Sequence, residues 1–117
     1  PIVILTVGTG IDPFQNPLVG DITSCVAGLL PYLSDEQLLV LRSTVVPGVT
    51  EFVQQWLVRQ GRRTPVAFCP ERVVQGRCIL ELQALPQIVS ATSPAAEATV
   101  AELFARVAPR VVRMQPK

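Results

Sequence analysis

Short apolar runs alternate with segments of helical periodicity along the whole chain, and this alternation limits the fold more than any other feature. The runs that carry a strand signal are 2–7, 38–41, 66–69, 87–91 and 110–113. The first run has no polar alternation, which predicts a strand buried on both faces. Strands separated by helices form βαβ units with right-handed crossovers. The sequence therefore predicts a doubly wound α/β fold, a partial Rossmann-like parallel sheet of four to five strands with flanking helices.

The segments between these runs predict the helices. Asp21 is the expected N-cap of the first helix, and Pro31 is expected to distort its end. The second helix should end before Gly61, and the third should begin at Ser93-Pro94. The expected core faces of the three helices are Ile22, Cys25, Val26, Leu29, Leu30 and Leu33; Val49, Phe52, Val53, Trp56 and Leu57; and Val100, Leu103, Phe104 and Val107. The segment 70–86 has no clear period, apart from a helical turn expected over 79–82.

Composition limits the classes of function. The chain has 117 residues, 49% of them hydrophobic and 16% charged, and we predict one domain over residues 1–117. A net charge of +1 argues against nucleic acid as a partner. The absence of histidine excludes the usual zinc sites, and no metal is expected. Three cysteines without a CxxC motif are typical of a reducing compartment, so we predict a cytoplasmic protein with no membrane segment.

Polar residues gather where three of the predicted strands end, which is where open parallel sheets bind ligands. After the first strand, two glycines flank Thr9, a pattern that also fits a tight turn. After the second strand, Ser43 and Thr44 offer hydroxyls to a phosphate or ribose, although they could equally cap the following helix. After the third strand, Glu71 and Arg72 stand side by side, as a binding pair or as a surface ion pair.

Together, in this order and spacing, the three loops resemble the UDP-glucose/GDP-mannose dehydrogenase family. The segments that carry the resemblance are 4–9, 39–51 and 69–76, and the resemblance extends along almost the whole chain. Its specific part is the run Ser-Thr-Val-Val-Pro-Gly, followed at this distance by Pro-Glu-Arg-Val. Gln75 stands where the UDP-glucose branch has a second carboxylate, and this favours the UDP-N-acetylmannosamine dehydrogenase branch.

The resemblance implies a reaction and roles for individual residues. Members of this family oxidise the C6 hydroxyl of a nucleotide sugar to a carboxylate and reduce two NAD molecules, using a cysteine nucleophile from a later domain. By resemblance, Thr9 and Thr44 contact the dinucleotide, and Thr44 also orients a water during thioester hydrolysis. Glu71, Arg72 and Val73 line the sugar side of the cleft, where Arg72 donates to an acidic or carbonyl group of the substrate.

Several parts that the family uses do not occur in these 117 residues. No Gly-x-Gly-x-x-Gly sequence is present, and Gly10 replaces the proline usual in the first loop. The nucleophile motif is missing, and Cys25, Cys69 and Cys78 are interpreted as structural or incidental. The catalytic lysine is unmatched, since Lys117 is terminal. We therefore expect a fragment of the NAD-binding domain, inactive alone, with weak or absent NAD binding.

Two functions remain open at this point. The first is a fragment of an NAD-dependent dehydrogenase whose parent oxidises a UDP-sugar, expected to be UDP-N-acetylmannosamine. The second is a stand-alone α/β binding or assembly module without catalysis. In this second case, the sheet edge left by the absent first βαβ unit pairs with a second copy to give a homodimer. The oligomeric state of the chain distinguishes the two functions.

Overall fold

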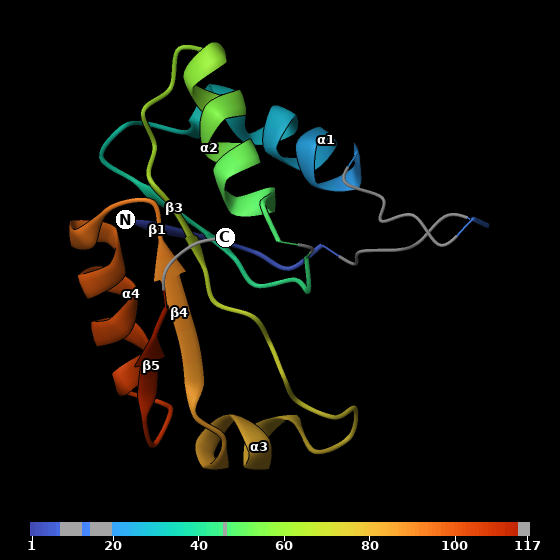
Figure 1. The fold of residues 1–117 in the computed structure, drawn as a ribbon, viewed down its shortest axis with the longest axis vertical. Coiled ribbons are helices and arrows are strands. Elements are labelled where there is room, and N and C mark those ends of the chain that lie inside the picture. The colour runs from blue at the N-terminus through green and yellow to red at the C-terminus, as the bar shows by residue number, and fades with distance from the viewer. Residues whose placement is uncertain (8–12, 15–19, 46, 115–117) are drawn as a thin grey trace.

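The computed structural model describes residues 1–7, 13–14, 20–45 and 47–114. Its five-stranded sheet has the order β1-β2-β3-β4-β5 (Figure 1). The strands are β1 (Ile2–Leu5), β2 (Leu38–Leu41), β3 (Val66–Phe68), β4 (Gln87–Ala91) and β5 (Val111–Arg113). The helices are α1 (Gly20–Leu29), the 3₁₀ helix η1 (Leu30–Tyr32), α2 (Val49–Arg59), α3 (Cys78–Ala84) and α4 (Pro94–Ala105). No helix within the described ranges is long and apolar enough to cross a bilayer. The predicted α/β class and all five predicted strands are confirmed.

The strand directions differ from an entirely parallel sheet at one place. Among the described strands, β1 and β2, β2 and β3, and β4 and β5 pair in parallel, whereas β3 and β4 pair antiparallel. The cause lies in the segment between β3 and β4. Its short helix, α3, lies beyond one end of the sheet and does not cross back over a face (Figure 1). The strand β4 therefore starts at the end where β3 stops.

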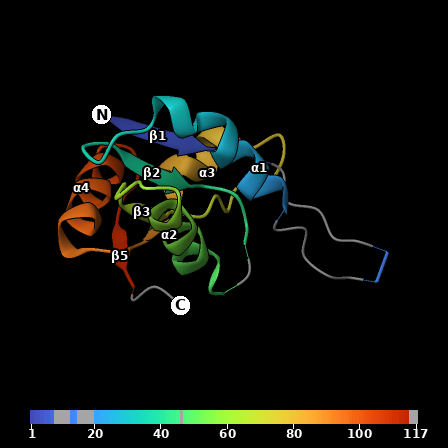
Figure 2. The same ribbon diagram turned by 90° about the horizontal axis from the view of Figure 1, so that it is seen from above.

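Helices cover both faces of the sheet, as a doubly wound fold requires (Figure 2). Side chains of β2 alternate between two buried clusters because successive strand residues point to opposite faces. One cluster packs the sheet against α1 and α2 and comprises Leu5, Ile22, Val26, Leu33, Leu39, Leu41, Val49, Val53, Leu57 and Val66. The other packs it against α4 and comprises Leu38, Val40, Ala67, Cys69, Val89, Ala91, Ala96, Val100, Ala101 and Phe104. Burial on both faces explains the uninterrupted apolar sequence of β2.

The prediction that the first strand is buried on both faces is wrong. The strand β1 lies at the edge of the described sheet, and it ends at Leu5 rather than at Val7. Ile2 and Ile4 on one face are 37% and 47% exposed, whereas Leu5 is 6% exposed. The apolar run reports strand propensity, but burial of its outer face depends on a neighbour that the described residues do not supply.

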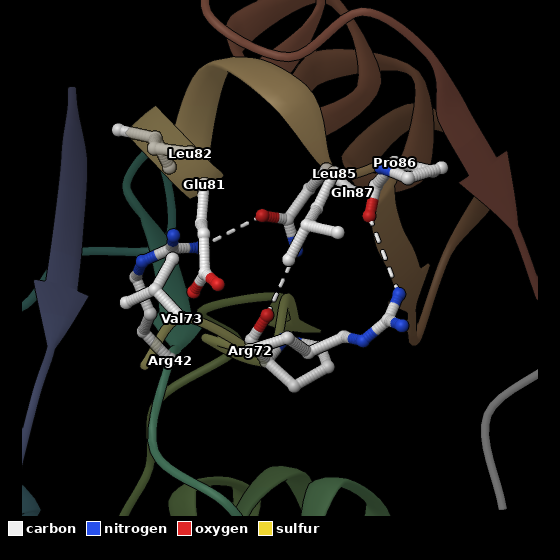
Figure 3. Close-up of a pocket in the computed structure, with 9 residues that line it drawn as sticks. Arg42, Arg72, Val73, Glu81, Leu82, Leu85, Pro86 and Gln87 are labelled. Carbon is white, nitrogen blue, oxygen red and sulfur yellow. Dashed lines mark hydrogen bonds between the residues drawn. The ribbon is translucent and has the colours of Figure 1, made fainter. Parts of the chain in front are cut away.

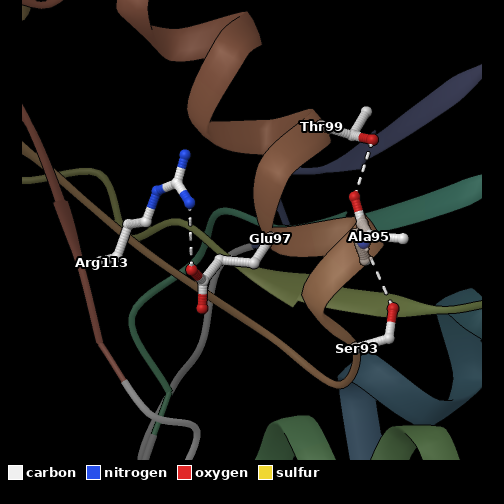
Figure 4. A network of polar contacts seen from close by, with 6 residues as sticks. Ser93, Ala95, Glu97, Thr99 and Arg113 are labelled. Atoms are coloured by element: carbon white, nitrogen blue, oxygen red, sulfur yellow. Dashed lines mark hydrogen bonds and ion pairs between the residues drawn. The ribbon is translucent and has the colours of Figure 1, made fainter.

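The helix ends follow local rules with three corrections. The hydroxyl of Ser93 accepts from the Ala96 amide at 3.2 Å and caps α4 as predicted (Figure 4). Pro31 lies in η1, where the first helix tightens, as predicted. Asp21 lies in the first turn of α1 rather than at its N-cap. Phe52 and Val107 were expected in the core but are 39% and 45% exposed. Val107 lies beyond the end of α4.

Candidate functional site

The carboxyl ends of β1, β2 and β3 lie at the same end of the sheet because these strands are parallel. The hydroxyl of Ser43, two residues after β2, donates to the backbone carbonyl of Val7 after β1. The loops after the first and second strands are therefore joined. Thr9, the predicted cofactor contact in the first of them, lies outside the described residues.

Thr44 is exposed in the loop between β2 and α2. The N-cap of α2 is Gly48, which has φ +93° and no side-chain cap. Glycine adopts this left-handed conformation without strain. The N-cap position of α2 is therefore occupied by Gly48, and not by Ser43 or Thr44 as the alternative left open by the sequence would require. The exposed position of Thr44 fits a residue that meets a ligand at the strand ends.

The loop that follows β3 carries the predicted substrate residues. The Glu71 amide donates to the Arg42 carbonyl at 3.0 Å, which holds this loop beside the end of β2. Glu71 and Arg72 are exposed, and Val73 is half-buried. A carboxylate oxygen of Glu71 accepts from the Val73 amide at 3.2 Å, and Arg72 reaches the Pro86 carbonyl at 3.4 Å. Among the salt bridges of the described residues there is none between Glu71 and Arg72, so the alternative of a mutual surface ion pair is not found.

A small pocket lies between this loop and α3 (Figure 3). It is lined by Arg42, Pro70, Arg72, Val73, Glu81, Leu82, Leu85, Pro86 and Gln87. Its volume of about 10 Å³ suffices for one water molecule, which is far too little for a nucleotide sugar. We call the side of the loop that faces this pocket its inner side. The pocket cannot hold a large ligand, and Glu71 and Arg72 are exposed.

Three polar residues on this inner side were not predicted from the sequence. Arg42 donates to the Cys69 carbonyl at 3.2 Å and to the Gln87 side-chain oxygen at 3.1 Å. A Glu81 carboxylate oxygen accepts from the Val74 amide and ties α3 to the loop. The sequence signals for this cluster are weak: Arg42 is a charged residue directly after the buried strand β2, and Gln87 is a polar residue at the start of β4.

The cysteines do not provide a nucleophile at this site. Burial raises the pKa of the Cys69 thiol from 9.0 to about 12, and the nearby positive charge of Arg42 offsets only part of this rise. Cys69 therefore stays protonated at neutral pH, and a thiol is a poor nucleophile. Cys25 is half-buried on α1, and Cys78 is exposed at the start of α3 rather than in a loop. Within the described ranges, no group of His, Cys, Asp and Glu side chains could hold a metal ion.

The described strand ends carry groups that a ligand could reach. Thr44 is exposed in the loop between β2 and α2. Gly48, at the N-cap of α2, has no side chain that would keep a ligand from the backbone. A pyrophosphate needs a glycine-rich turn before a helix, and the 117 residues contain no Gly-x-Gly-x-x-Gly sequence. The turn that usually binds a pyrophosphate is therefore not found in these 117 residues.

Comparison with known proteins agrees with this geometry. The model of the NAD binding domain of the UDP-glucose/GDP-mannose dehydrogenase family matches residues 1–108. The chain is 28% identical over 107 residues to the UDP-N-acetyl-D-mannosamine dehydrogenase of Escherichia coli K12, covering 79% of this chain and 26% of that protein. It is 36% identical over 62 residues to the enzyme of the same name from Methanococcus aeolicus, covering 52% of this chain and 14% of that protein.

A solved structure shares the fold. The UDP-D-ManNAc dehydrogenase of Pyrococcus horikoshii superposes with a TM-score of 0.89 at 23% identity, covering 98% of this chain and 29% of that chain. The chain thus spans about a quarter of the length of the relatives that it matches. At this identity the likeness establishes the Rossmann-type fold and leaves the choice of substrate to other arguments.

Proposed function

We propose, because the chain belongs to the UDP-glucose/GDP-mannose dehydrogenase family, that it forms part of an enzyme that oxidises the C6 hydroxyl of UDP-N-acetylmannosamine to a carboxylate. Residues 1–117 would be the C-terminal part of its NAD-binding domain. The match of the NAD binding domain to residues 1–108 carries this proposal. The relatives named UDP-N-acetyl-D-mannosamine dehydrogenase support the choice of sugar, as does Gln75 in place of a second carboxylate. The free thiols of Cys25, Cys69 and Cys78 support a cytoplasmic location.

The chain's own residues would bind and orient the reactants. When bound, NAD accepts hydride from the sugar carbon. Thr44 would contact the dinucleotide and also orient the water that hydrolyses the thioester. Glu71 and Val73 would line the sugar side of the cleft. Arg72 makes only a long bond to Pro86, so its guanidinium can exchange that bond for an acidic or carbonyl group of the substrate.

The chain by itself should bind NAD weakly and should not complete the reaction. The reason is that the pyrophosphate contacts, the catalytic lysine and the cysteine nucleophile are not matched in its sequence. Isothermal titration of the purified chain with NAD should show no saturation below the millimolar range, and micromolar affinity would contradict this. A coding sequence that continues upstream into Gly-x-Gly-x-x-Gly and downstream into a cysteine motif should encode an active enzyme. Stop codons on both sides would overturn the proposal.

The role of Thr44 can be tested in that longer enzyme. Thr44→Val removes the hydroxyl at nearly constant volume, and we expect NADH formation from UDP-N-acetylmannosamine to fall about tenfold or more, as expected for one lost hydrogen bond to a ligand. Thr99→Val is the matched control, because Thr99 is also exposed but donates to the Ala95 carbonyl of its own helix (Figure 4). Equal activity of the two variants would remove Thr44 from the site.

A second candidate function is assembly through the edge of the sheet. The strand β1 presents Ile2 and Ile4 at 37% and 47% exposure, whereas the opposite edge, β5, is three residues long and carries an ion pair from Arg113 to Glu97. An apolar edge invites pairing, and a charged short edge discourages it. A second copy would then pair antiparallel with β1 around a two-fold axis.

Sedimentation distinguishes this candidate from the first. If the chain is an assembly module, it should sediment as a stable dimer. Ile4→Lys places a charge on the β1 strand that forms the contact, and should convert this dimer to a monomer. Ile79→Lys is the matched control, since Ile79 is 73% exposed on α3, away from the sheet edge. A monomer, or a concentration-dependent aggregate of undefined size, would count against the assembly module.

A further inference from the structure

Arg42 and Gln87 form a polar network beneath the loop that carries Glu71 and Arg72 (Figure 3). Arg42 is the first residue after β2, and its guanidinium lies over the ring of Phe104, with its central carbon 4.9 Å from the ring centroid. One guanidinium nitrogen donates to both the Cys69 carbonyl and the Gln87 side-chain oxygen. The contact with the ring and these two bonds fix the orientation of the guanidinium plane.

Gln87 connects Arg42 to Pro70, the loop residue that follows Cys69. It opens β4 and is only 6% exposed. Its side-chain nitrogen donates to the Pro70 carbonyl at 3.0 Å and to the Ile88 carbonyl at 2.8 Å. Because Arg42 needs an acceptor, it holds the amide oxygen of Gln87 toward itself and the amide nitrogen toward Pro70. Without Arg42, the amide oxygen of Gln87 would lose the donor that fixes its side.

The loop backbone is therefore held at three successive residues from its inner side. The Cys69 carbonyl accepts from Arg42, the Pro70 carbonyl accepts from Gln87, and the Glu71 amide donates to the Arg42 carbonyl. These residues belong to no helix or strand, so their course depends on such bonds. With the backbone groups turned inward, the side chains of Glu71 and Arg72 are left at the exposed surface.

From this network we infer that Arg42 and Gln87 are positioning residues, which hold Glu71, Arg72 and Val73 in the orientation that binds the sugar. The inference rests on the proposed function for the identity of the ligand, whereas the positioning itself is independent of any ligand. Arg42 would act through the loop, with its guanidinium on the side opposite to the substrate. Half-burial of Arg42, its double donation and its contact with Phe104 distinguish it from a solvated surface charge.

Amide hydrogen exchange tests the positioning in the chain without ligand. We expect Arg42→Met to raise exchange at the Glu71 and Val74 amides about tenfold, the effect of losing roughly one hydrogen bond of local stability. The strand amides of Leu39 and Ala67 should not change. Arg42→Lys should restore most of the protection, because an ammonium group also donates to both acceptors. An equal increase at every amide, or no increase in the loop, would overturn the inference.

Titration with UDP-N-acetylmannosamine, followed by amide chemical shifts, tests the consequence for binding. Saturable shifts at Glu71 and Val73 in the unsubstituted chain should weaken about tenfold in Arg42→Met and recover in Arg42→Lys. Arg62→Met is the matched control, since Arg62 is also half-buried and donates to a backbone carbonyl, that of Leu30. A chain that shows no saturable shifts would count against the proposed function, while the exchange rates would still decide the positioning. Equal weakening by Arg62→Met and Arg42→Met would overturn the special role of Arg42.

Discussion

Raising the pH should lower the stability of this chain through a buried thiol, that of Cys69. Its side chain has no exposed surface, and burial raises the pKa of the thiol from 9.0 to about 12. Below pH 9 the thiol is protonated in both the folded and the unfolded chain, so it causes no dependence of stability on pH. Between pH 9 and 12 the unfolded chain releases the proton and the folded chain retains it. The free energy of unfolding must therefore fall as the pH rises through this range.

The size of the effect follows from the difference in pKa. A difference of about 3 units corresponds to about 4 kcal/mol once the pH exceeds both values, and to about 2 kcal/mol at pH 10.5. Cys69→Ala removes the titrating group and leaves a small cavity, which should cost about 1 kcal/mol at any pH. The unsubstituted chain should then be more stable than Cys69→Ala by about 1 kcal/mol at pH 7, and less stable by about 1 kcal/mol at pH 10.5.

Urea unfolding under reducing conditions, followed by circular dichroism at pH 7, 9 and 10.5, measures this crossing. All other titrating groups are common to both proteins, so their contributions cancel in the difference. A difference in unfolding free energy that stays constant from pH 7 to 10.5 would refute the reasoning. It would mean that the Cys69 thiol ionises as readily in the folded chain as in the unfolded one.

Three further substitutions or reactions test local features of the fold. Ser93→Ala removes the cap that accepts from the Ala96 amide, and urea unfolding should show a loss of about 1 kcal/mol; no loss would mean that the cap is dispensable. Val100→Ala in the α4 core should cost about 2 kcal/mol, while Val107→Ala, at 45% exposure, should change stability by less than about 0.5 kcal/mol. Equal costs of the two valine substitutions would contradict the assignment of the buried face. Alkylation of the folded chain followed by mass spectrometry should modify Cys78 first; a buried thiol reacting as fast would argue against the packing described.

The sequence predicts those elements whose signals are local. The β2 strand was placed at Leu38–Leu41 because a strand buried on both faces is apolar at every position, and α4 was placed at Ser93-Pro94 because cap and first-turn residues have fixed preferences. The burial of β1 was mispredicted because an apolar run that includes Ile2 and Ile4 reads the same whether or not another element covers that face of the strand. A pattern along the chain reports how a segment folds, but it does not report what lies next to that segment.

For the candidate site too, local signals could be read from the sequence, whereas contacts between distant segments could not. Glu71 and Arg72 were predicted from the sequence because an acidic and a basic residue side by side at a strand end are hard to explain by packing. In the structure both side chains are exposed. The contact between Arg42 and Gln87 was not predicted, because the two residues are 45 positions apart in the sequence. This contact appears only when the end of β2 and the start of β4 are placed in space.

The unpredicted strand direction and the unpredicted residues have one cause. In an entirely parallel sheet, the first residue of β4 would lie at the end opposite to the carboxyl ends of β2 and β3. Because β4 runs antiparallel to β3, with Ala67 opposite Ala91 and Phe68 opposite Ser90, its start returns to the edge where β2 and β3 stop. Gln87 can thereby contact Arg42 and the Pro70 carbonyl. The reversal of one strand thus supplies the loop with an inner support, and any change that restored a crossover between β3 and β4 would remove that support from the site.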